Sequence, residues 1–300
     1  MIALSTAWLG PKRPTVEETI RKAVKAGFKA LEIGAWGEMP PAGDLVSLAK
    51  ELGFTYTSVH NIAYREGLAP EEAFGDGLSS SDLAMRRRAI EATCRSVELA
   101  RIIGAKFVVI HAGNVDIADA REKQAHAQEL VASGRRKRAF EFMSLCMAER
   151  NSVAAPAVEA AAASLAEVFR RAGDFPLAIE CRIHYHSIPQ PGELQFLTTV
   201  LAGRPVYYWH DVGHARVEEM LGLVPALSWL EVFGALLAGI HFHDVKGFKD
   251  HRVPGTGDVD FATFAPYAGD DVIKVIELPP FFDEEEVLRG KAHLEACGIE

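Results

Sequence analysis

The chain has 300 residues, of which 49% are hydrophobic and 24% charged, and its formal net charge is −9. This composition is typical of a globular protein with enough apolar material for a large core, and the acidic balance disfavours a nucleic-acid partner, because proteins that bind nucleic acids usually present a basic face. No run of about 18 or more apolar residues is present, so no membrane span is expected.

The N-terminal residues Met1–Leu4 lack a basic region followed by an apolar stretch, so no secretion signal is expected. No pair of cysteines has the spacing of a metal or redox motif; the four are Cys94, Cys146, Cys181 and Cys297. We therefore expect reduced thiols in a cytoplasmic protein.

Short β-rich runs alternate with helical stretches along the chain, a pattern typical of βα units and a parallel sheet. In chain order, the first part is predicted to form strand Ile2–Thr6, helix Val16–Ala26, strand Ala30–Gly34, helix Leu45–Leu52, strand Tyr56–His60, a helix from an N-cap at Asp82 to Ile103, and strand Phe107–His111. Gly27, Gly53 and Gly104 end the three helices, as C-cap glycines do. About 65 residues then pass before the next strand.

The remainder of the chain is regular again. It is predicted to form strand Leu177–Glu180, a helix near Glu193–Leu201, strand Val206–Asp211, a helix near Val224–Leu237, strand Gly239–His243, a short helix near Phe261–Tyr267, strand Val272–Glu277 and helix Glu284–Ala296. Eight strands and eight helical segments, of which one is the helix of the fourth strand that follows the insertion, predict an α/β fold. We expect one (β/α)8 TIM barrel over residues 1–300, with no second domain and a helical insertion at about 114–155 after the fourth strand.

Side chains that bind metals stand at or near the ends of six of these strands. They are His60, His111, Glu180, Asp211 with His214, His241 with His243, and Glu277. An isolated buried carboxylate costs several kcal/mol unless it is paired or metal-bound. In a closed parallel barrel the strand ends meet at one face, which is where such barrels carry out chemistry. The sequence therefore predicts a metal site at that face.

Strand alternation indicates which of these side chains share the barrel interior, because residues two apart lie on the same face. The inward positions include Glu180, His241, His243 and Glu277. Asp211 falls in phase with Trp209 and Tyr207, which would place two bulky aromatic rings inside the barrel, whereas His210 falls outward. We favour Asp211 over His210 as a ligand.

The ordered set of strand-end motifs resembles the xylose-isomerase-like barrel superfamily, which includes sugar isomerases and epimerases, inosose dehydratases and type IV apurinic endonucleases. The motifs are Glu180, WHDVGH at 209–214, HFHDVK at 241–246, HRVPGTGDVDF at 251–261 and VIE at 275–277. The closest pattern is that of the sugar isomerase and epimerase branch. In its ketose 3-epimerase members, the resemblance implies one divalent metal held by Glu180, Asp211, His241 and Glu277, with His214 at a substrate-binding position.

Three carboxylates and one imidazole make an oxygen-rich site that suits Mn²⁺ best, with Mg²⁺, Co²⁺ or Zn²⁺ as alternatives. A metal of this kind chelates the carbonyl oxygen and the adjacent hydroxyl of a sugar. Glu180 and Glu277 are expected to act as the acid and base that move a proton through a metal-stabilised enediolate.

Further residues are expected around the substrate. His60 and His111 match extra zinc ligands of the endonuclease branch and also recur near the sugar in single-metal members. His251 matches another endonuclease ligand, but Lys249 stands where that branch has an acid, and Asp250 is adjacent instead.

The other candidate substrate contacts have open alternatives. Arg182, with His184 and His186 in the same loop, is expected either to meet hydroxyls or a phosphate or to be solvated. Glu32 is expected to hydrogen-bond substrate or to pair with a buried lysine. Trp8 and Trp36 are expected to wall the pocket or to belong to the core.

The predicted function is therefore a metal-dependent isomerase or epimerase of a small sugar or polyol. A phosphodiester-cleaving endonuclease with several metals and a keto-inositol dehydratase that uses the same site remain as alternatives. The acidic charge and Lys249 favour the first reading.

The insertion is predicted to contain two helices, Ile117–Ser133 and Arg136–Arg150, separated at Gly134. Loops of this length on the catalytic face of a barrel are usually functional. An apolar stripe on the second helix has to be covered; it consists of Phe140, Met143, Cys146 and Met147. We expect a lid over the barrel mouth that also contributes to homodimer contacts. The basic run at 135–138 is expected to be a solvated helix start.

Overall fold

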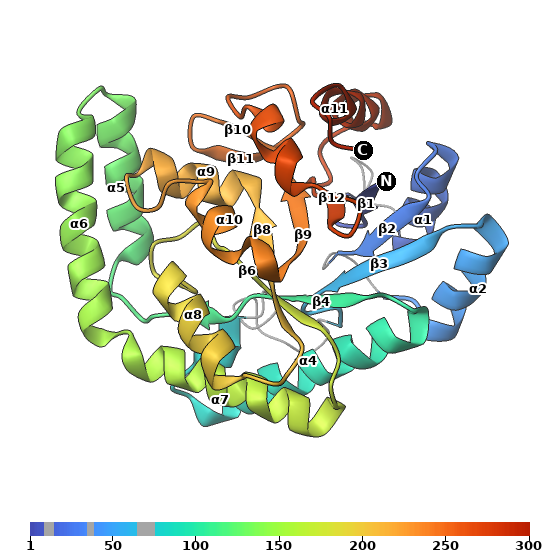
Figure 1. Cartoon of the computed structure of the whole chain (residues 1–300), viewed down its shortest axis with the longest axis horizontal. Coiled ribbons are helices and arrows are strands. Elements are labelled where there is room, and N and C mark those ends of the chain that lie inside the picture. The colour runs from blue at the N-terminus through green and yellow to red at the C-terminus, as the bar shows by residue number, and fades with distance from the viewer. Residues whose placement is uncertain (9–14, 35–38, 65–75) are drawn as a thin grey trace.

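The computed structural model describes residues 1–8, 15–34, 39–64 and 76–300. Eight parallel strands close into a barrel in the order β1-β12-β9-β8-β6-β4-β3-β2 (Figure 1). These strands are β1 (Ile2–Ser5), β2 (Ala30–Ile33), β3 (Thr55–His60), β4 (Phe107–Ile110), β6 (Leu177–Glu180), β8 (Val206–Asp211), β9 (Leu237–Phe242) and β12 (Ile273–Ile276). The predicted (β/α)8 TIM barrel is confirmed.

Helices surround the barrel. They are α1 (Val16–Lys25), α2 (Ala42–Leu52), α4 (Leu83–Ile103), α7 (Ala155–Ala172), α8 (Pro191–Val200), α9 (Val212–Met220), α10 (Ser228–Phe233) and α11 (Glu284–Ala296), with short 3₁₀ turns η1 (Asp76–Ser79), η2 (Gly234–Leu236) and η3 (Phe261–Tyr267). α4 begins and ends where the sequence predicts. The Asp82 carboxylate accepts the N–H groups of Ala84 and Met85, and Gly104 ends the helix at φ +74°.

Several elements differ from the prediction. α9 starts directly after β8, where no helix was expected, because the Asp211 carboxylate accepts the His214 N–H and caps it. The helix expected near Val224–Leu237 is reduced to α10 and η2. Two small antiparallel sheets were not foreseen: β5 (Gly113–Asn114) with β7 (Ser187–Ile188), and β10 (Asp244–Lys246) with β11 (Lys249–Arg252).

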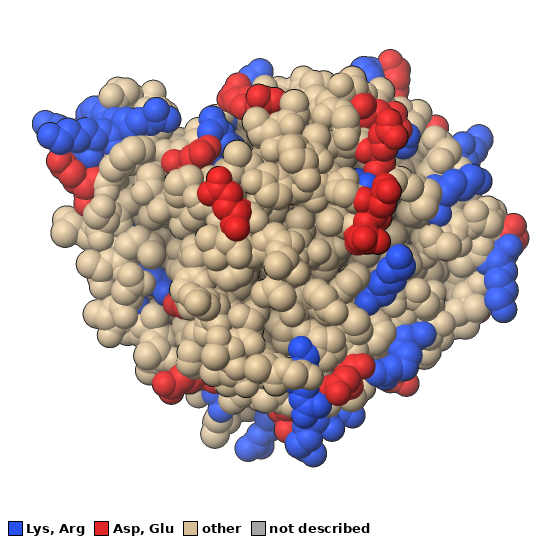
Figure 2. All heavy atoms as spheres, viewed as in Figure 1, with Lys and Arg blue, Asp and Glu red and all other residues tan. Residues whose placement is uncertain are grey.

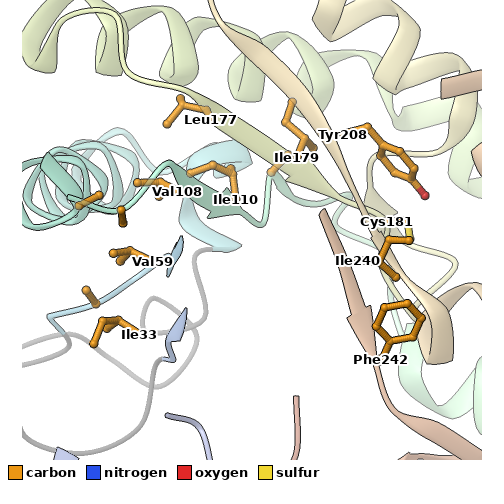
Figure 3. Close-up of a cluster of buried hydrophobic side chains, with 14 of the residues drawn as sticks. Ile33, Val59, Val108, Ile110, Leu177, Ile179, Cys181, Tyr208, Ile240 and Phe242 are labelled. Atoms are coloured by element: carbon orange, nitrogen blue, oxygen red, sulfur yellow. The ribbon is translucent and has the colours of Figure 1, made fainter. Parts of the chain in front are cut away.

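The outward faces of the barrel strands form the main core. Their apolar side chains lie between the sheet and the helices (Figure 3). The labelled members from neighbouring strands include Ile33, Val59, Val108, Ile110, Leu177, Ile179, Tyr208, Ile240 and Phe242, and all are completely buried. Because alternate residues face the helices, the residues between them are forced into the barrel.

Small side chains make room for the aromatic rings inside the barrel. Trp209 is completely buried in an interior cluster whose other members are mostly small: Ala3, Ala30, Ala178, Ala238, Val109 and Val275. A Cβ on Gly239 would lie 2.3 Å from the Trp209 ring. The small residues of the neighbouring strands therefore leave room for the aromatic rings that share the inward face with Asp211. As predicted, Asp211 points into the barrel, whereas His210 points outward and contacts Tyr208 and Phe264.

The insertion forms a helical hairpin of α5 (Ala120–Ala132) and α6 (Arg136–Val153), which stands at the left edge of Figure 1. Met143 and Cys146 are buried against this chain's own α5, α9 and β10. The Phe140 ring lies against Gly222 just after α9. Basic side chains gather at the hairpin tip (Figure 2), where residues 135–138 are all exposed.

Among the described helices, no single one has the length and apolarity to cross a membrane. One pair bent by 60°, α6 with α7, meets those two criteria together.

Candidate metal centre

Four ligand-type side chains converge at the carboxyl ends of neighbouring strands. Glu180 ends β6, Asp211 ends β8, His241 lies on β9 and Glu277 follows β12. The side chains of Glu180, Asp211 and His241 are completely buried, whereas that of Glu277 is 12% exposed. The centre therefore has a buried floor that opens on the side of Glu277.

His241 lies in the middle of this group. Its Nδ1 is 2.7 Å from Glu180 Oε1, 3.3 Å from Glu277 Oε2 and 3.8 Å from Asp211 Oδ2. Burial by itself would lower the pKa of His241, but the carboxylates of Glu277 and Glu32 reverse this and hold the pKa well above its usual value. One nitrogen thus faces all three predicted carboxylate ligands.

The second oxygen of Glu180 faces the opposite side of the pocket. Oε2 is 2.8 Å from His111 Nε2 and 2.7 Å from the Arg182 guanidinium. Burial alone would raise the pKa of Glu180, but the hydrogen bonds from His111 and His241 outweigh burial, and the pKa lies well below its usual value. Burial and the neighbouring Arg182 lower the pKa of His111 to about 3, so this imidazole is neutral at pH 7.

Asp211 is held from two sides. Its Oδ1 accepts the His214 backbone N–H at 2.7 Å, and its carboxylate accepts the Nε2–H of His243 at 2.9 Å. The other nitrogen of His243, Nδ1, accepts the His251 N–H at 2.9 Å, which defines the tautomer. Burial raises the pKa of Asp211, but the neighbouring His214 and His243 lower it to about 2 overall.

His60 and His214 lie beside the four central side chains. His60 Nε2 is 4.0 Å from oxygens of both Glu180 and Glu277, and its ring stacks on His241 with centroids 5.6 Å apart. His214 Nδ1 is 3.2 Å from the Cys181 carbonyl oxygen and 3.5 Å from Asp211 Oδ2.

His251 closes the exposed side of the centre. Its Nε2 is 3.7 Å from Glu277 Oε2, and its Nδ1 is 2.9 Å from Asp250 Oδ2. Asp250 also lies 3.9 Å from His214 Nε2. Asp250 therefore contacts His251 directly and reaches His214, although the acid of the endonuclease pattern would stand one residue earlier.

The remaining candidates lie in different surroundings. Glu32 is completely buried and contacts His241 and Ser58. Trp8 is buried, and its indole N–H donates to the Phe282 carbonyl at 2.8 Å. Trp36 lies outside the described residues. His184 and His186 stack on each other at 5.3 Å, and burial lowers the pKa of each, to about 3 and about 4.

The donor set fits a divalent cation. Among the described residues, donor atoms of His60, Glu180, His241 and Glu277 lie within 4.8 Å of one another, as do those of Glu180, Asp211 and His214, and those of Asp211, His243 and Glu277. These sets share members and together contain three carboxylates and four imidazoles; the four predicted ligands among them, Glu180, Asp211, His241 and Glu277, supply all three carboxylates and one imidazole. Such a set suits Mn²⁺ and Mg²⁺, which prefer oxygen ligands.

Two contributors were not assigned roles by the sequence. His243 supports Asp211, and Ser58 Oγ donates to Glu32 at 2.8 Å. The alternation of His241 and His243 shows that both face inward. It does not show that His243 turns its Nε2 toward a carboxylate, because the position of the His251 N–H depends on the β10–β11 hairpin.

Comparison with known proteins identifies the family and the fold. A family model described as xylose isomerase-like TIM barrel matches residues 20–270. A comparison with curated protein sequences returns no match.

Solved structures with the same fold cover nearly all of the chain. A 3-keto-D-glucoside 4-epimerase from E. coli has a TM-score of 0.67 and 16% identity over 99% of each chain. A D-psicose 3-epimerase from Clostridium cellulolyticum has a TM-score of 0.65 and 15% identity over 99% of each chain. A putative xylose isomerase from Rhodospirillum rubrum has a TM-score of 0.63 and 18% identity, over 99% of this chain and 97% of that one.

Proposed function

The chain belongs to the xylose isomerase-like TIM barrel family, and on that basis we propose that it is a divalent-metal-dependent isomerase or epimerase acting on a small sugar or polyol. The observation that carries the proposal is the placement of two carboxylates beside one imidazole nitrogen. Glu180 Oε1 and Glu277 Oε2 lie 2.7 and 3.3 Å from His241 Nδ1 and come from strands on either side of it.

Glu180, Asp211, His241 and Glu277 would hold the ion: Glu180, His241 and Glu277 belong to one group of possible ligands, and Asp211 shares further groups with Glu180 and with Glu277. When bound, a divalent ion supplies Lewis acidity and a template for a carbonyl oxygen and the adjacent hydroxyl. The hydrogen bond between His241 Nδ1 and Glu180, and the 3.3 Å contact of the same nitrogen with Glu277, fit this role, because an ion would replace the proton at Nδ1.

Glu277 and Glu180 are the proposed acid–base pair. A carboxylate that removes a proton from a carbon next to a carbonyl can be matched by a second one that returns it on the other side. His60, His111, Arg182, His214 and His251 surround the pair and are the proposed contacts to hydroxyl groups. The names of the E. coli and Clostridium neighbours describe epimerisation of a ketosugar, which supports this substrate class.

One observation favours the multi-metal alternative. His214, His243 and His251 offer a further group of nitrogens within 4.8 Å of one another, with Asp250 beside them. However, His243 uses both ring nitrogens in hydrogen bonds in this structure: Nε2 donates to Asp211, and Nδ1 accepts the His251 N–H. Elemental analysis of the purified protein separates the functions: one ion per chain supports the sugar enzyme, and three would support an endonuclease-type site.

Solvent exchange tests the proton-transfer reaction directly. In D₂O, wild type should incorporate deuterium at a carbon next to the carbonyl of at least one member of a panel of ketohexoses and 3-keto-glycosides, read by ¹H NMR. Glu277→Gln should bind the same sugar but lose about 10²- to 10⁴-fold in exchange rate, the usual contribution of a general base.

Glu285→Gln is the matched control, because it makes the same change on an 83% exposed side chain and should keep the wild-type rate. Turnover without any exchange would exclude the proton-transfer route and point to a hydride shift. No exchange and no turnover across the whole panel would reject the proposed function.

A further inference from the structure

Glu32 lies on β2, one residue before its end, in a fully enclosed position across the His241 ring from the predicted ligands. Both of its oxygens lie 3.2 Å from His241 Nε2. Oε2 also accepts the Ser58 hydroxyl at 2.8 Å, and Ser58 is paired in register with Glu32 on the neighbouring strand β3. All three side chains are completely buried. An ionised carboxylate in such a place needs a partner, and its partners here are a hydroxyl and an imidazole.

The His241 ring therefore connects two groups of carboxylates. Nδ1 faces Glu180, Glu277 and Asp211, and Nε2 faces Glu32. A neutral imidazole carries one proton, and only its unprotonated nitrogen can bind a metal. The nitrogen that donates a hydrogen bond to a carboxylate keeps its proton, so the other nitrogen presents its lone pair.

We propose that Glu32 is a positioning residue, which keeps a proton on Nε2 of His241 and fixes the ring orientation, so that Nδ1 is the nitrogen that gives up its proton to the metal. The role rests on the proposed function of the site. Glu32 is separated from the ligand oxygens by the width of the imidazole, and it does not belong to the ligand-type groups found among the described residues. It is thus assigned neither to the ion nor to the substrate.

Ser58 holds the Glu32 carboxylate in its orientation. Its hydroxyl holds Oε2, so the carboxylate cannot rotate away from Nε2 without losing a buried hydrogen bond. The chain of contacts Ser58–Glu32–His241 runs across β3, β2 and β9, three strands of a closed barrel. These strands hold the contact between Glu32 and His241 Nε2 in place before any metal or substrate binds.

The decisive measurement is the dissociation constant of Mn²⁺ alone, with no sugar present. Glu32→Asp keeps the charge but withdraws the carboxylate by one methylene, so it should weaken Mn²⁺ binding by about 10- to 100-fold, as losses of such supporting contacts do. Glu32→Gln keeps an acceptor of the right length and should fall between Glu32→Asp and wild type. Ser58→Ala should weaken binding less than Glu32→Asp.

Glu218→Asp is the matched control. Glu218 is also a completely buried glutamate, but its Oε2 accepts the Trp229 indole N–H at 3.0 Å and touches no ligand. The same shortening there should leave the Mn²⁺ constant unchanged. If charge alone mattered, Glu32→Asp would bind as wild type does, and that result would overturn the proposal.

The wild-type protein supplies a test that no variant's folding can affect. In ¹⁵N NMR spectra of the Zn²⁺-loaded protein, His241 should be protonated at Nε2 and metal-shifted at Nδ1; ligation through Nε2 would overturn the proposal. A different result would reject the proposed function: wild type that binds no divalent ion at all. If wild type binds Mn²⁺ and Glu32→Asp binds it equally well, only the proposed role of Glu32 is rejected.

Discussion

At the scale of single residues, the centre depends on side chains that cannot move. The His243 ring fills the space where Gly213 would carry a Cβ, which would lie 2.1 Å from its Cε1 atom. The same ring donates to Asp211 and stacks on His251 with centroids 3.9 Å apart. Gly213 is thus required by the position of an imidazole rather than by its own backbone angles.

Gly213→Ala should therefore destabilise the protein by about 1–3 kcal/mol, the usual cost of overpacking a rigid core. It should also weaken metal binding, because Asp211 loses its partner. Thermal unfolding and a metal titration measure the two effects. Gly192→Ala in α8 is the control, since a Cβ there meets nothing within 4 Å. Equal stability of the two variants would contradict this account.

The inward-facing residues could be predicted from the sequence, because the alternation of side chains along a strand depends only on the order of residues in that strand. Glu180, Asp211 and His241 can be assigned to the interior in this way. The partners of Asp211 and His241 could not be derived, because they come from other strands and from the β10–β11 hairpin, whose residue His251 has a φ of +49°. Contacts between elements depend on barrel register, which no local pattern encodes.

At the scale of elements, α9 was the helix that sequence patterns missed. It is short, and its residues Val212–Met220 carry buried side chains on nearly every face. A helix buried all round shows no amphipathic period, so the usual signal is absent. One of those side chains is Glu218, whose carboxyl accepts the Trp229 indole N–H. Burial raises the pKa of Glu218 to about 8, although the Trp229 and Gln190 hydrogen bonds lower it in part.

This shift makes stability depend on pH. The pKa of Glu218 is raised on folding, so its contribution is complete below about pH 4.5 and is lost as the pH rises toward 8. Glu218→Gln mimics the protonated form. Its free energy of unfolding should gain on that of wild type between pH 5 and pH 8, by up to roughly 1.4 kcal/mol per pKa unit, and its melting temperature should rise relative to wild type over the same range.

Thermal melts of the metal-free proteins across that pH range test this expectation. Glu231→Gln on the exposed side of α10 should keep a constant offset from wild type. A constant offset for Glu218→Gln as well would show that Glu218 is ionised in the folded protein.

At the scale of the whole molecule, the barrel follows from the repeated βα pattern, whereas the role of the α5–α6 hairpin does not. Its apolar stripe predicts a covering surface, and that surface is α9 and β10 of the same chain. Leu145, on the opposite face of α6, is 71% exposed, and Val153, at the end of the helix, is 50% exposed. Dimer contacts through the insertion remain a prediction, and these exposed side chains are where they would form.

Variants at Met143 and Leu145 distinguish packing of the hairpin within one chain from association of two chains. Met143→Ser should cost about 2–5 kcal/mol, because Met143 is 1% exposed, and should reduce turnover by loosening α9. Leu145→Ser should leave stability unchanged and shift a dimer toward monomer. Thermal unfolding, sugar turnover and light scattering report the three quantities. A Met143→Ser protein with wild-type stability would mean that the hairpin packs differently.

Arg150 determines how the hairpin is attached. It is 1% exposed near the end of α6, its guanidinium binds Glu193 at the start of α8, and it donates to the Ser187 carbonyl at 3.0 Å. Separating the hairpin from the barrel would leave a charge without its partner in a dry interface. The two parts should therefore unfold in one cooperative step. A protease that cuts the exposed tip should nick the chain and leave both fragments associated.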